Sequence, residues 1–571
     1  MEKIIKLRKY FKKEKIDGYL VPKNDEFFGE YIPSYNDRLN YISNFSGSYG
    51  FALILKTKNY LFVDGRYTLQ ALKQSGKFFK IITFPKIMPS VILKNKKLTI
   101  GFDPNLFTRK TINFFGRNNC NFKPLENNLV DRIWKRKFKY SKNNFYKLPE
   151  NSVGESYKSK INKIVYNLKK KNANYHFITS SENSAWLFNI RGRDVKYSPL
   201  PHSYVLINQN KEIKFFCDLK KVSKSLKKKF NKVKFLNERA LRGELSKITG
   251  MKFLIDKNTC SIFYENLIVR KNKILDLQDP IYNLKAIKSK KEITNIRQTH
   301  IYDGVALTKF LIWLKKNYSK RKITELSAAK QLLNFRKINK KFKFSSFPTI
   351  SSSGPNGAII HYKPTIKTNR KLKKGDIYLV DSGGQYEFGT TDVTRTISLN
   401  NKSKRVKNIF TRVLKGHIAV ANYNLKKNTT GSQIDSSARK YLKQIGLDYA
   451  HGTGHGVGYF LNVHEGPQAI SRNNRIKFEE GMIVSNEPGY YEKNNFGIRI
   501  ENLIYVKKSK QKKYFENLTL APIDKDLINE KLLSKAERKW MNLYHKNVFN
   551  LIKKFMAKHE IQDLKKACST I

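Results

Sequence analysis

Apolar residues follow two periods along the chain, and changes of period divide it into blocks. Over the first fifteen residues they recur at helical spacing, at Ile4, Ile5, Leu7, Tyr10 and Phe11. This spacing predicts an amphipathic helix. Short apolar runs at 18–22 (GYLVP) and 49–55 (YGFALIL) predict strands that alternate with helices. Residues 1–150 are therefore expected to form a first α/β block.

The same pattern starts again after residue 150. A helical stretch around 158–171 precedes three strand-like runs, HFITS (176–180), WLFNI (186–190) and SYVLI (203–207). This restart predicts that residues 151–283 form a second block that resembles the first.

A third block, residues 284–513, has a different character. Its first part, 286–314, carries apolar residues at helical spacing and predicts two long amphipathic helices. From Phe344 onward, glycines punctuate strand-like runs. Residues 514–571 form a C-terminal extension. A chain of 571 residues is too long for one core, so we expect several domains of mixed α/β (α+β) class.

The composition favours packed domains in a reducing compartment. Hydrophobic residues make up 40% of the chain and aromatic residues 13%, which excludes a disordered polymer. The four cysteines lie far apart without a CxxC pair, which argues against a disulfide framework or a zinc ribbon. The first residues lack the apolar run of a signal peptide, and no stretch approaches a membrane span. We expect a cytoplasmic protein with no membrane partner.

The charge is strongly positive, with 113 basic and 45 acidic residues and a net charge of +68. Nucleic acid or another anionic surface is one interpretation. The lysines are spread over the whole chain, however, and no RNA-recognition, zinc-finger or homeodomain pattern accompanies them. We therefore favour a compositional bias of the surface and expect no specific nucleic-acid partner.

Two pairs of acidic residues stand in apolar strand-like runs of the third block. Asp381 and Asp392 lie on two runs joined by a glycine-containing turn, and Glu487 and Glu501 lie on two later runs. A carboxylate beside residues such as Val380 is costly to bury unless a positive charge neutralises it. Two hairpins that each offer two inward carboxylates would form a cage for divalent cations.

Three histidines lie between these pairs, His451, His455 and His464, in the segment HGTGHGVGYFLNVHEGP. One imidazole added to four carboxylates would hold two metal ions. Each element alone has a simpler interpretation: a turn aspartate, a structural histidine, or a phosphate loop, although the Lys-Ser/Thr ending of a P-loop is missing. The combination in this order favours the metal site.

The third block resembles the metallopeptidase family of aminopeptidase P, prolidase and methionine aminopeptidase, which has the pita-bread fold. The segments HGTGHGVG and FLNVHEGP are similar to the three-domain aminopeptidase P branch in particular. RLNYISNFSGSYGFALI and LFVDGRYTLQA resemble its creatinase-type N-terminal domain, and NLVDRIW and AWLFNIRGRDVKYSP its second domain. The extension resembles the same branch in FENLTLAPIDKDLI and ERKWMNLYHKNV, but departs from its tryptophan-containing ending after Met556.

The resemblance implies two creatinase-type domains (1–150 and 151–283), a pita-bread catalytic domain (284–513) and the extension (514–571). It also implies five metal ligands: Asp381, Asp392, His455, Glu487 and Glu501. Asp392 and Glu501 would bridge two divalent ions, for which the family implies manganese. His361 and His464 would contact the substrate and the transition state, and His451 would line the substrate site. Arg499, two residues before Glu501, would orient the side chains that surround the metal ligands.

The implied activity is that of an Xaa-Pro aminopeptidase, which releases the first residue of peptides that carry proline in second position. A metal-bridging hydroxide would attack the scissile carbonyl, His464 would help to stabilise the oxyanion, and Glu487 would carry the proton to the leaving nitrogen. The family also implies a homodimer. Two alternatives stay open: a prolidase-like dipeptidase, and a catalytically silent scaffold that binds nucleic acid through its positive surface.

Overall fold

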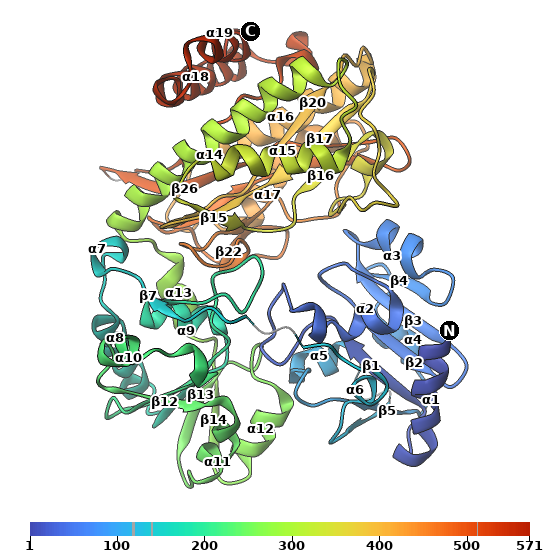
Figure 1. The fold of residues 1–571 in the computed structure, drawn as a ribbon, viewed down its shortest axis with the longest axis vertical. Helices are drawn as coiled ribbons and strands as arrows, with labels where there is room; N and C mark the ends of the chain where they lie inside the picture. The colour runs from blue at the N-terminus through green and yellow to red at the C-terminus, as the bar shows by residue number, and fades with distance from the viewer. Residues whose placement is uncertain (117–119, 139–140, 511) are drawn as a thin grey trace. The chain divides into compact units, whose positions relative to one another are not determined.

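A computed structural model describes residues 1–116, 120–138, 141–510 and 512–571 (Figure 1). The chain forms two compact units. The first comprises Met1–Glu150 and Glu155–Tyr282, and the second Asn151–Gly154 and Asn283–Ile571. The domain boundaries given above stay predictions.

The first unit contains two six-stranded sheets with one topology. The first sheet has the order β4 (Lys80–Phe84), β3 (Asn59–Asp64), β2 (Phe51–Leu55), β1 (Gly18–Pro22), β5 (Thr99–Phe102), β6 (Asn121–Pro124). The second has the order β12 (Val233–Asn237), β11 (Ile213–Cys217), β10 (Tyr204–Asn208), β8 (Tyr175–Ile178), β13 (Lys252–Ile255), β14 (Lys273–Asp276). In each sheet the first strand in sequence pairs antiparallel on one side (β1 with β2, β8 with β10) and parallel on the other (β1 with β5, β8 with β13). The expected likeness of the two blocks is confirmed at the level of topology.

Helices accompany both sheets, and two short strands, β7 (Tyr146–Lys147) and β9 (Ile190–Arg191), pair with each other. The helices up to residue 153 are α1 (Glu2–Glu14), α2 (Arg38–Ser43), α3 (Thr68–Ser75), α4 (Pro89–Leu93), α5 (Arg109–Phe114), α6 (Leu129–Ile133) and α7 (Glu150–Val153). Those that follow are α8 (Tyr157–Lys170), α9 (Ser181–Phe188), α10 (Lys224–Lys228), α11 (Leu241–Ser246), α12 (Ile262–Val269) and α13 (Ile281–Ala286).

The strand predicted at WLFNI is wrong, because Trp186 to Phe188 end helix α9. Residues 183–188 of this helix are all buried. A short apolar run that is buried on every side has no period that separates a helix from a strand.

The second unit begins with α14 (Lys290–Asn317), a single helix where the sequence predicted two. Ser289 starts it with a capping box, since its hydroxyl accepts from the Glu292 N–H and the Glu292 carboxylate accepts from the Ser289 N–H. Gly304 does not break the helix. A Cβ there would lie 2.4 Å from the Leu520 carbonyl oxygen, so the glycine allows a close approach of the C-terminal segment.

The other named elements of the described part of this unit are five α-helices and the strands of four small sheets. The helices are α15 (Glu325–Lys337), α16 (Lys404–Ala421), α17 (Gly431–Lys443), α18 (Lys535–Ile552) and α19 (Lys558–Ala567). One three-stranded sheet has the order β16 (Ile350–Ser353), β17 (Ile377–Ser382), β20 (Val393–Ser398), and the other has the order β15 (Phe342–Ser345), β18 (Gly384–Tyr386), β19 (Gly389–Thr390). The five-stranded sheet has the order β22 (Glu465–Ile470), β21 (Gly454–Gly456), β23 (Ile483–Asn486), β26 (Asn502–Ser509), β27 (Lys512–Asn517). The two-stranded sheet pairs β24 (Gly489–Glu492) with β25 (Phe496–Arg499).

Hydrophobic clusters hold helices against these strands. One cluster joins Phe310 of α14 and Leu332 of α15 to Val380 of β17 and Ile397 of β20. A second cluster joins α16 and α18 to β25, and a third joins α17 to β23 and β26. The strands that carry the acidic pairs are therefore fixed by helix packing (Figure 1).

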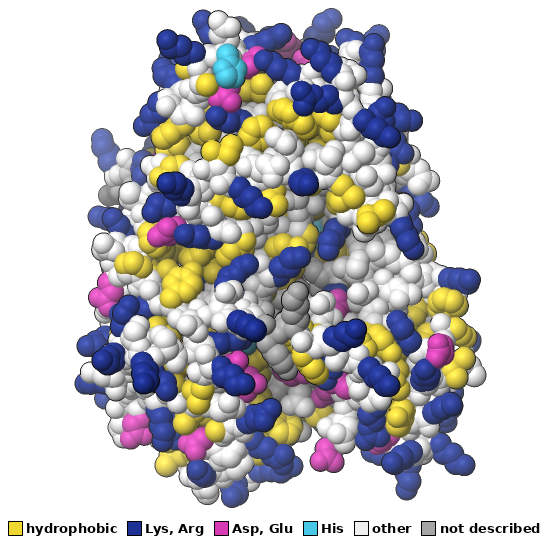
Figure 2. All heavy atoms as spheres, viewed as in Figure 1, with side chains coloured by type: hydrophobic (Ala, Val, Ile, Leu, Met, Phe, Trp, Pro, Cys, Tyr) yellow, Lys and Arg dark blue, Asp and Glu magenta, His cyan; other side chains and the backbone are white. Residues whose placement is uncertain are grey.

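Lysine and arginine side chains are scattered over the whole face drawn in Figure 2, among hydrophobic and uncharged groups. On that face they do not gather over one element. None of the described helices is both long and apolar enough to cross a membrane.

Candidate metal centre

The first acidic pair is brought together by the antiparallel pairing of β17 with β20. Asp381 lies on β17 opposite Thr394, and Asp392 directly precedes β20. Both side chains are buried, with residue exposures of 8% and 4%.

The second pair lies at one end of the β23–β26 ladder. Asn486, the last residue of β23, pairs with Asn502, the first residue of β26; Glu487 directly follows β23 and Glu501 directly precedes β26. The Glu501 N–H donates to the Thr394 carbonyl at 3.2 Å, and the Thr394 hydroxyl donates to Glu501 Oε2 at 2.7 Å. These two bonds join the hairpins, so that all four carboxylates converge.

Ligand atoms approach within 4.8 Å of one another in three overlapping sets: Asp381, Asp392, Glu501; His455, Glu487, Glu501; and Asp392, His455, His464. The first two sets contain only residues predicted as ligands. Asp392 and Glu501, the predicted bridging residues, each occur in two sets. His464, predicted to contact the substrate, joins the third set, and its ring lies edge-on to that of His455 with centroids 4.2 Å apart.

His455 on β21 is held in the tautomer that a metal ligand requires. Its Nδ1–H donates to the Gly456 carbonyl at 2.9 Å, which leaves Nε2 for a cation. Nε2 lies 3.4 Å from Asp392 Oδ2 and 3.5 Å from Glu487 Oε1. Burial opposes a charge on this ring, but the hydrogen bond to Asp392 and the charges of Glu487 and Asp392 raise its pKa to about 9.

The charge balance of the cluster fits divalent cations. Burial and the neighbouring carboxylates raise the pKa of Asp381 to about 7, although Arg499 opposes the shift. Burial and the same repulsion raise the pKa of Glu501 well above its ordinary value. Asp381 Oδ1 is buried without a hydrogen-bond partner among the described residues. Oxygen-rich ligation with one imidazole suits hard or borderline divalent ions, which would satisfy this oxygen and the excess negative charge.

Arg499 holds Asp381 in place. Its Nη2 donates to Asp381 Oδ2 at 2.6 Å, its Nε to the Thr394 hydroxyl at 3.0 Å, and its Nη1 to the Tyr491 hydroxyl at 2.5 Å. The Tyr491 hydroxyl lies 2.9 Å from His451 Nε2, whose Nδ1 is occupied by the Gly452 carbonyl. A chain of hydrogen bonds therefore links Asp381 to His451.

Tyr491 was missed by the sequence analysis. It lies on β24, on the same hairpin as Arg499, and alternation along the two short strands was the only available signal. His361 lies in the turn that follows a 3₁₀ helix (Gly354–Ala358) and, like His451, belongs to none of the three sets.

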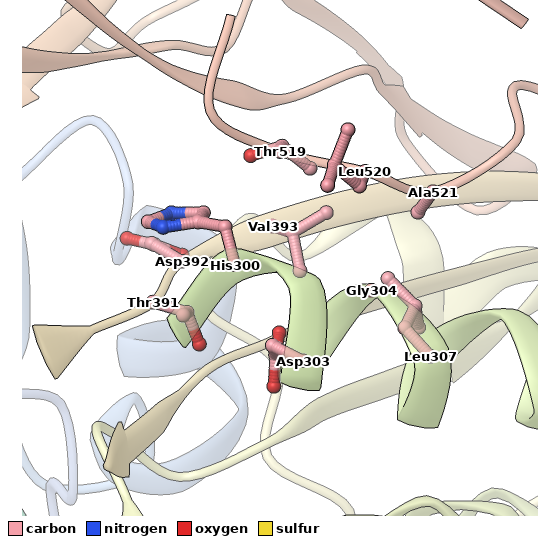
Figure 3. Close-up of a pocket in the computed structure, with 10 residues that line it drawn as sticks. All are labelled: His300, Asp303, Gly304, Leu307, Thr391, Asp392, Val393, Thr519, Leu520 and Ala521. Carbon is pink, nitrogen blue, oxygen red and sulfur yellow. The ribbon is translucent and has the colours of Figure 1, made fainter. Parts of the chain in front are cut away.

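A small cavity lies behind Asp392 (Figure 3). The volume in which the centre of a water molecule fits is about 10 Å³. The cavity is lined by His300, Asp303, Gly304, Leu307, Thr391, Asp392, Val393, Thr519, Leu520 and Ala521. His300 Nδ1 donates to the Ile296 carbonyl at 2.8 Å, so Nε2 is an acceptor. This Nε2 is buried and has no hydrogen-bond partner among the described residues.

The cavity predicts one ordered internal water that donates to His300 Nε2. A buried polar acceptor beside space for a single water molecule is the usual setting of such a site. A crystal structure at about 1.5 Å resolution, where bound waters are visible, checks this. Replacement of His300 by phenylalanine should remove the water, and a dry cavity in the unchanged protein would contradict the prediction.

Metal binding near neutral pH is expected to release protons. At pH 7 His455 carries a proton that must leave before Nε2 can bind a cation, and Asp381 is partly protonated. Binding should therefore release about one proton or more at pH 7, and the apparent affinity should fall as the pH falls. Calorimetric titration in two buffers of different ionisation enthalpy measures the number released. A value of zero at pH 7 would contradict this ligand set.

Family models match nearly the whole chain. Two models described as "Creatinase/Prolidase N-terminal domain" match residues 3–133 and 136–292. "Metallopeptidase family M24" matches residues 294–508, and "C-terminal region of peptidase_M24" matches residues 513–571.

Individual relatives match over the same length. A probable Xaa-Pro aminopeptidase P of Coprinopsis cinerea is 37% identical, over 96% of this chain and 94% of its own. The crystal structure of X-prolyl aminopeptidase from Caenorhabditis elegans, described as a cytosolic enzyme with a di-nuclear active site, is 30% identical with a TM-score of 0.94. It covers 100% of this chain and 99% of its own. Prolidase from Pyrococcus furiosus, 22% identical with a TM-score of 0.50, covers only 62% of this chain and shares the fold. The expected fold of two creatinase-type domains followed by a pita-bread domain is confirmed.

Proposed function

Since the chain belongs to metallopeptidase family M24, in its Xaa-Pro aminopeptidase branch, we propose that it removes the first residue from peptides with proline in second position. The observation that carries this proposal is the convergence of four carboxylates, three of them buried and that of Glu487 half-buried, with one correctly oriented imidazole. Two divalent ions would be held by Asp381, Asp392, His455, Glu487 and Glu501. When bound, such ions supply the Lewis acidity that activates water and polarises a carbonyl.

The side chains around the ligands perform the remaining tasks. His464, beside His455, donates a hydrogen bond to the oxygen that gains charge in the transition state. Glu487 takes up the proton of the attacking water and delivers it to the leaving proline nitrogen. Its side chain is more exposed than those of Asp381 and Asp392, which gives it access to substrate. Arg499 keeps Asp381 oriented, and His361 and His451 contact the peptide.

Full-length similarity favours an aminopeptidase over a dipeptidase. The chain matches the C. elegans X-prolyl aminopeptidase over all of its length, whereas the prolidase corresponds to about two thirds of it. The proposal includes a cytoplasmic location, for which the cytosolic description of the C. elegans enzyme is the support. Manganese and a homodimer stay predictions.

Metal reconstitution tests the function directly. Protein stripped with a chelator should be inactive, and addition of Mn²⁺ should restore about two ions per chain together with hydrolysis of a proline-containing tripeptide. Elemental analysis and mass spectrometry of the products are the measurements. Stable binding of metal without any peptide hydrolysis would support the silent scaffold instead.

The net charge of +68 is expected to give only non-specific nucleic-acid binding. A scattered lysine surface releases counterions without reading bases, so affinity should fall steeply as salt rises. Fluorescence titration of DNA and RNA oligonucleotides at salt concentrations between about 50 and 200 mM measures this fall in affinity. A sub-micromolar, sequence-selective complex at about 150 mM salt would promote the scaffold hypothesis.

A further inference from the structure

The C-terminal extension places helix α18 in the hydrophobic cluster that contains β25 and the residue before Glu501. This helix buries Met541 and Val548 in the hydrophobic cluster that also contains Ile498 and Ile500. It carries no residue of the three ligand sets. Two of its aromatic residues, Trp540 and Tyr544, are one helical turn apart, and their rings stack at 5.4 Å with an interplanar angle of 1°.

Tyr544 is joined to Glu501 through one arginine. Arg395 lies on β20 and is 1% exposed. Its Nη1 donates to the Glu501 carbonyl at 2.7 Å and to the Thr394 carbonyl at 2.8 Å, and its Nη2 donates to the Tyr544 hydroxyl at 2.8 Å. The same Nη2 also donates to the Ala521 carbonyl and to the Asn502 side chain, and Nε donates to the Pro522 carbonyl.

These partners are all uncharged. A buried guanidinium without a carboxylate is stabilised by its hydrogen bonds alone, because burial removes the water that would otherwise solvate its charge. Without the Tyr544 hydroxyl, the two N–H groups of Nη2 would have two acceptors instead of three. The Tyr544 hydroxyl therefore helps to set the orientation of the guanidinium group that holds the Glu501 carbonyl.

Trp540 contacts His417, and His417 is hydrogen-bonded to Asn486, the residue before Glu487. The rings of Trp540 and His417 meet edge-on with centroids 5.9 Å apart. His417 Nδ1 donates to the Asn486 carbonyl at 3.1 Å, and the Asn486 amide donates back to the His417 carbonyl at 2.9 Å. Asn486 directly precedes Glu487. The same face of α18 is therefore connected to the backbone at both glutamates, through Arg395 at Glu501 and through His417 at Glu487.

We propose that α18 is part of the metal centre's support, and that Tyr544 and Trp540 are positioning residues for Glu501 and Glu487. The inference rests on the proposed function, in which these glutamates are ligands. Partners that orient metal ligands alter metal affinity without touching the ion, because small displacements of a ligand weaken its bond.

Replacement of Tyr544 by phenylalanine tests the link to Glu501. We expect about a tenfold loss of apparent Mn²⁺ affinity, at the lower end of the effect of outer partners of metal ligands. The kcat at limiting Mn²⁺ should fall and recover in excess Mn²⁺, while KM for the peptide is unchanged. Trp540→Leu should show a smaller loss of the same kind.

Tyr505→Phe is the matched control. Tyr505 lies on β26, and its hydroxyl accepts from Arg297, whose side chain is exposed. This variant also loses an arginine–tyrosine hydrogen bond but should keep the wild-type Mn²⁺ affinity. Equal affinities of the two variants, or a loss of thermal stability in Tyr544→Phe without a loss of affinity, would overturn the proposal.

Hydrogen exchange of the unaltered protein gives a second test, which does not depend on the folding of a variant. If α18 stabilises the metal-binding geometry, metal binding must stabilise α18 by the same free energy. Mn²⁺ should therefore slow amide exchange in 535–552 more than in α19. Unchanged exchange in α18 on metal binding would overturn the proposal, whereas an absence of Mn²⁺ binding would instead overturn the proposed function.

Discussion

Replacing Asp392 with asparagine is expected to lower metal content and activity together while the fold survives. The amide keeps the shape of the side chain but removes one of the four negative charges around the two ions. As a residue of two ligand sets, Asp392 has no substitute. We expect kcat/KM to fall by on the order of a thousandfold, which corresponds to about 4 kcal/mol of transition-state stabilisation.

Elemental analysis, peptide hydrolysis and thermal unfolding of the purified variant are the measurements. Asp524→Asn is a suitable control, because Asp524 is also buried and ion-paired, with Lys315, but belongs to no ligand set. The control should lose some stability and keep its metal. Full metal occupancy with normal turnover in Asp392→Asn would remove Asp392 from the site.

Elements with a clear period were predictable from the sequence. The helical spacing of the first residues is α1, which buries Ile4, Leu7 and Phe11 on one face. The short run GYLVP has no such period, but it is strand β1 as expected. The prediction failed where local sequence is ambiguous. Helix α14 continues past Gly304, since the close approach of Leu520 from the C-terminal segment compensates for the weak helix propensity of glycine.

The residues of the candidate site also fall into two groups, those with a signal in the local sequence and those without one. The four acidic residues stood out because each interrupts an apolar run, and burial of a charge requires a partner. The histidine ligand could not be chosen among His451, His455 and His464 by spacing alone. Tyr491, Arg395 and Tyr544 escaped notice because their roles arise from contacts between distant segments, such as Arg395 with Tyr544, and no local pattern encodes those contacts.

Substrate specificity provides the second large expected effect. The enzyme should release arginine from Arg-Pro-Pro and hydrolyse Arg-Ala-Ala at least about a hundredfold more slowly in kcat/KM. A prolyl nitrogen has no N–H and a fixed φ near −65°, so a peptide with proline in second position is already restricted near one conformation. An alanine peptide loses more conformational freedom on binding and must bury an additional N–H.

A mass-spectrometric time course on matched peptides separates the three hypotheses. The proposed aminopeptidase cleaves Arg-Pro-Pro and longer proline peptides, because it binds the free amine and leaves the far end open. A prolidase is confined to the dipeptide Arg-Pro, since it recognises the carboxylate next to proline. The silent scaffold cleaves none of them with its metals bound. Equal rates on the alanine and proline series would end the case for proline specificity and leave only the metal-dependent hydrolase. Strong discrimination that persists in Tyr544→Phe at excess Mn²⁺ would show that the metal support and the proline site act independently.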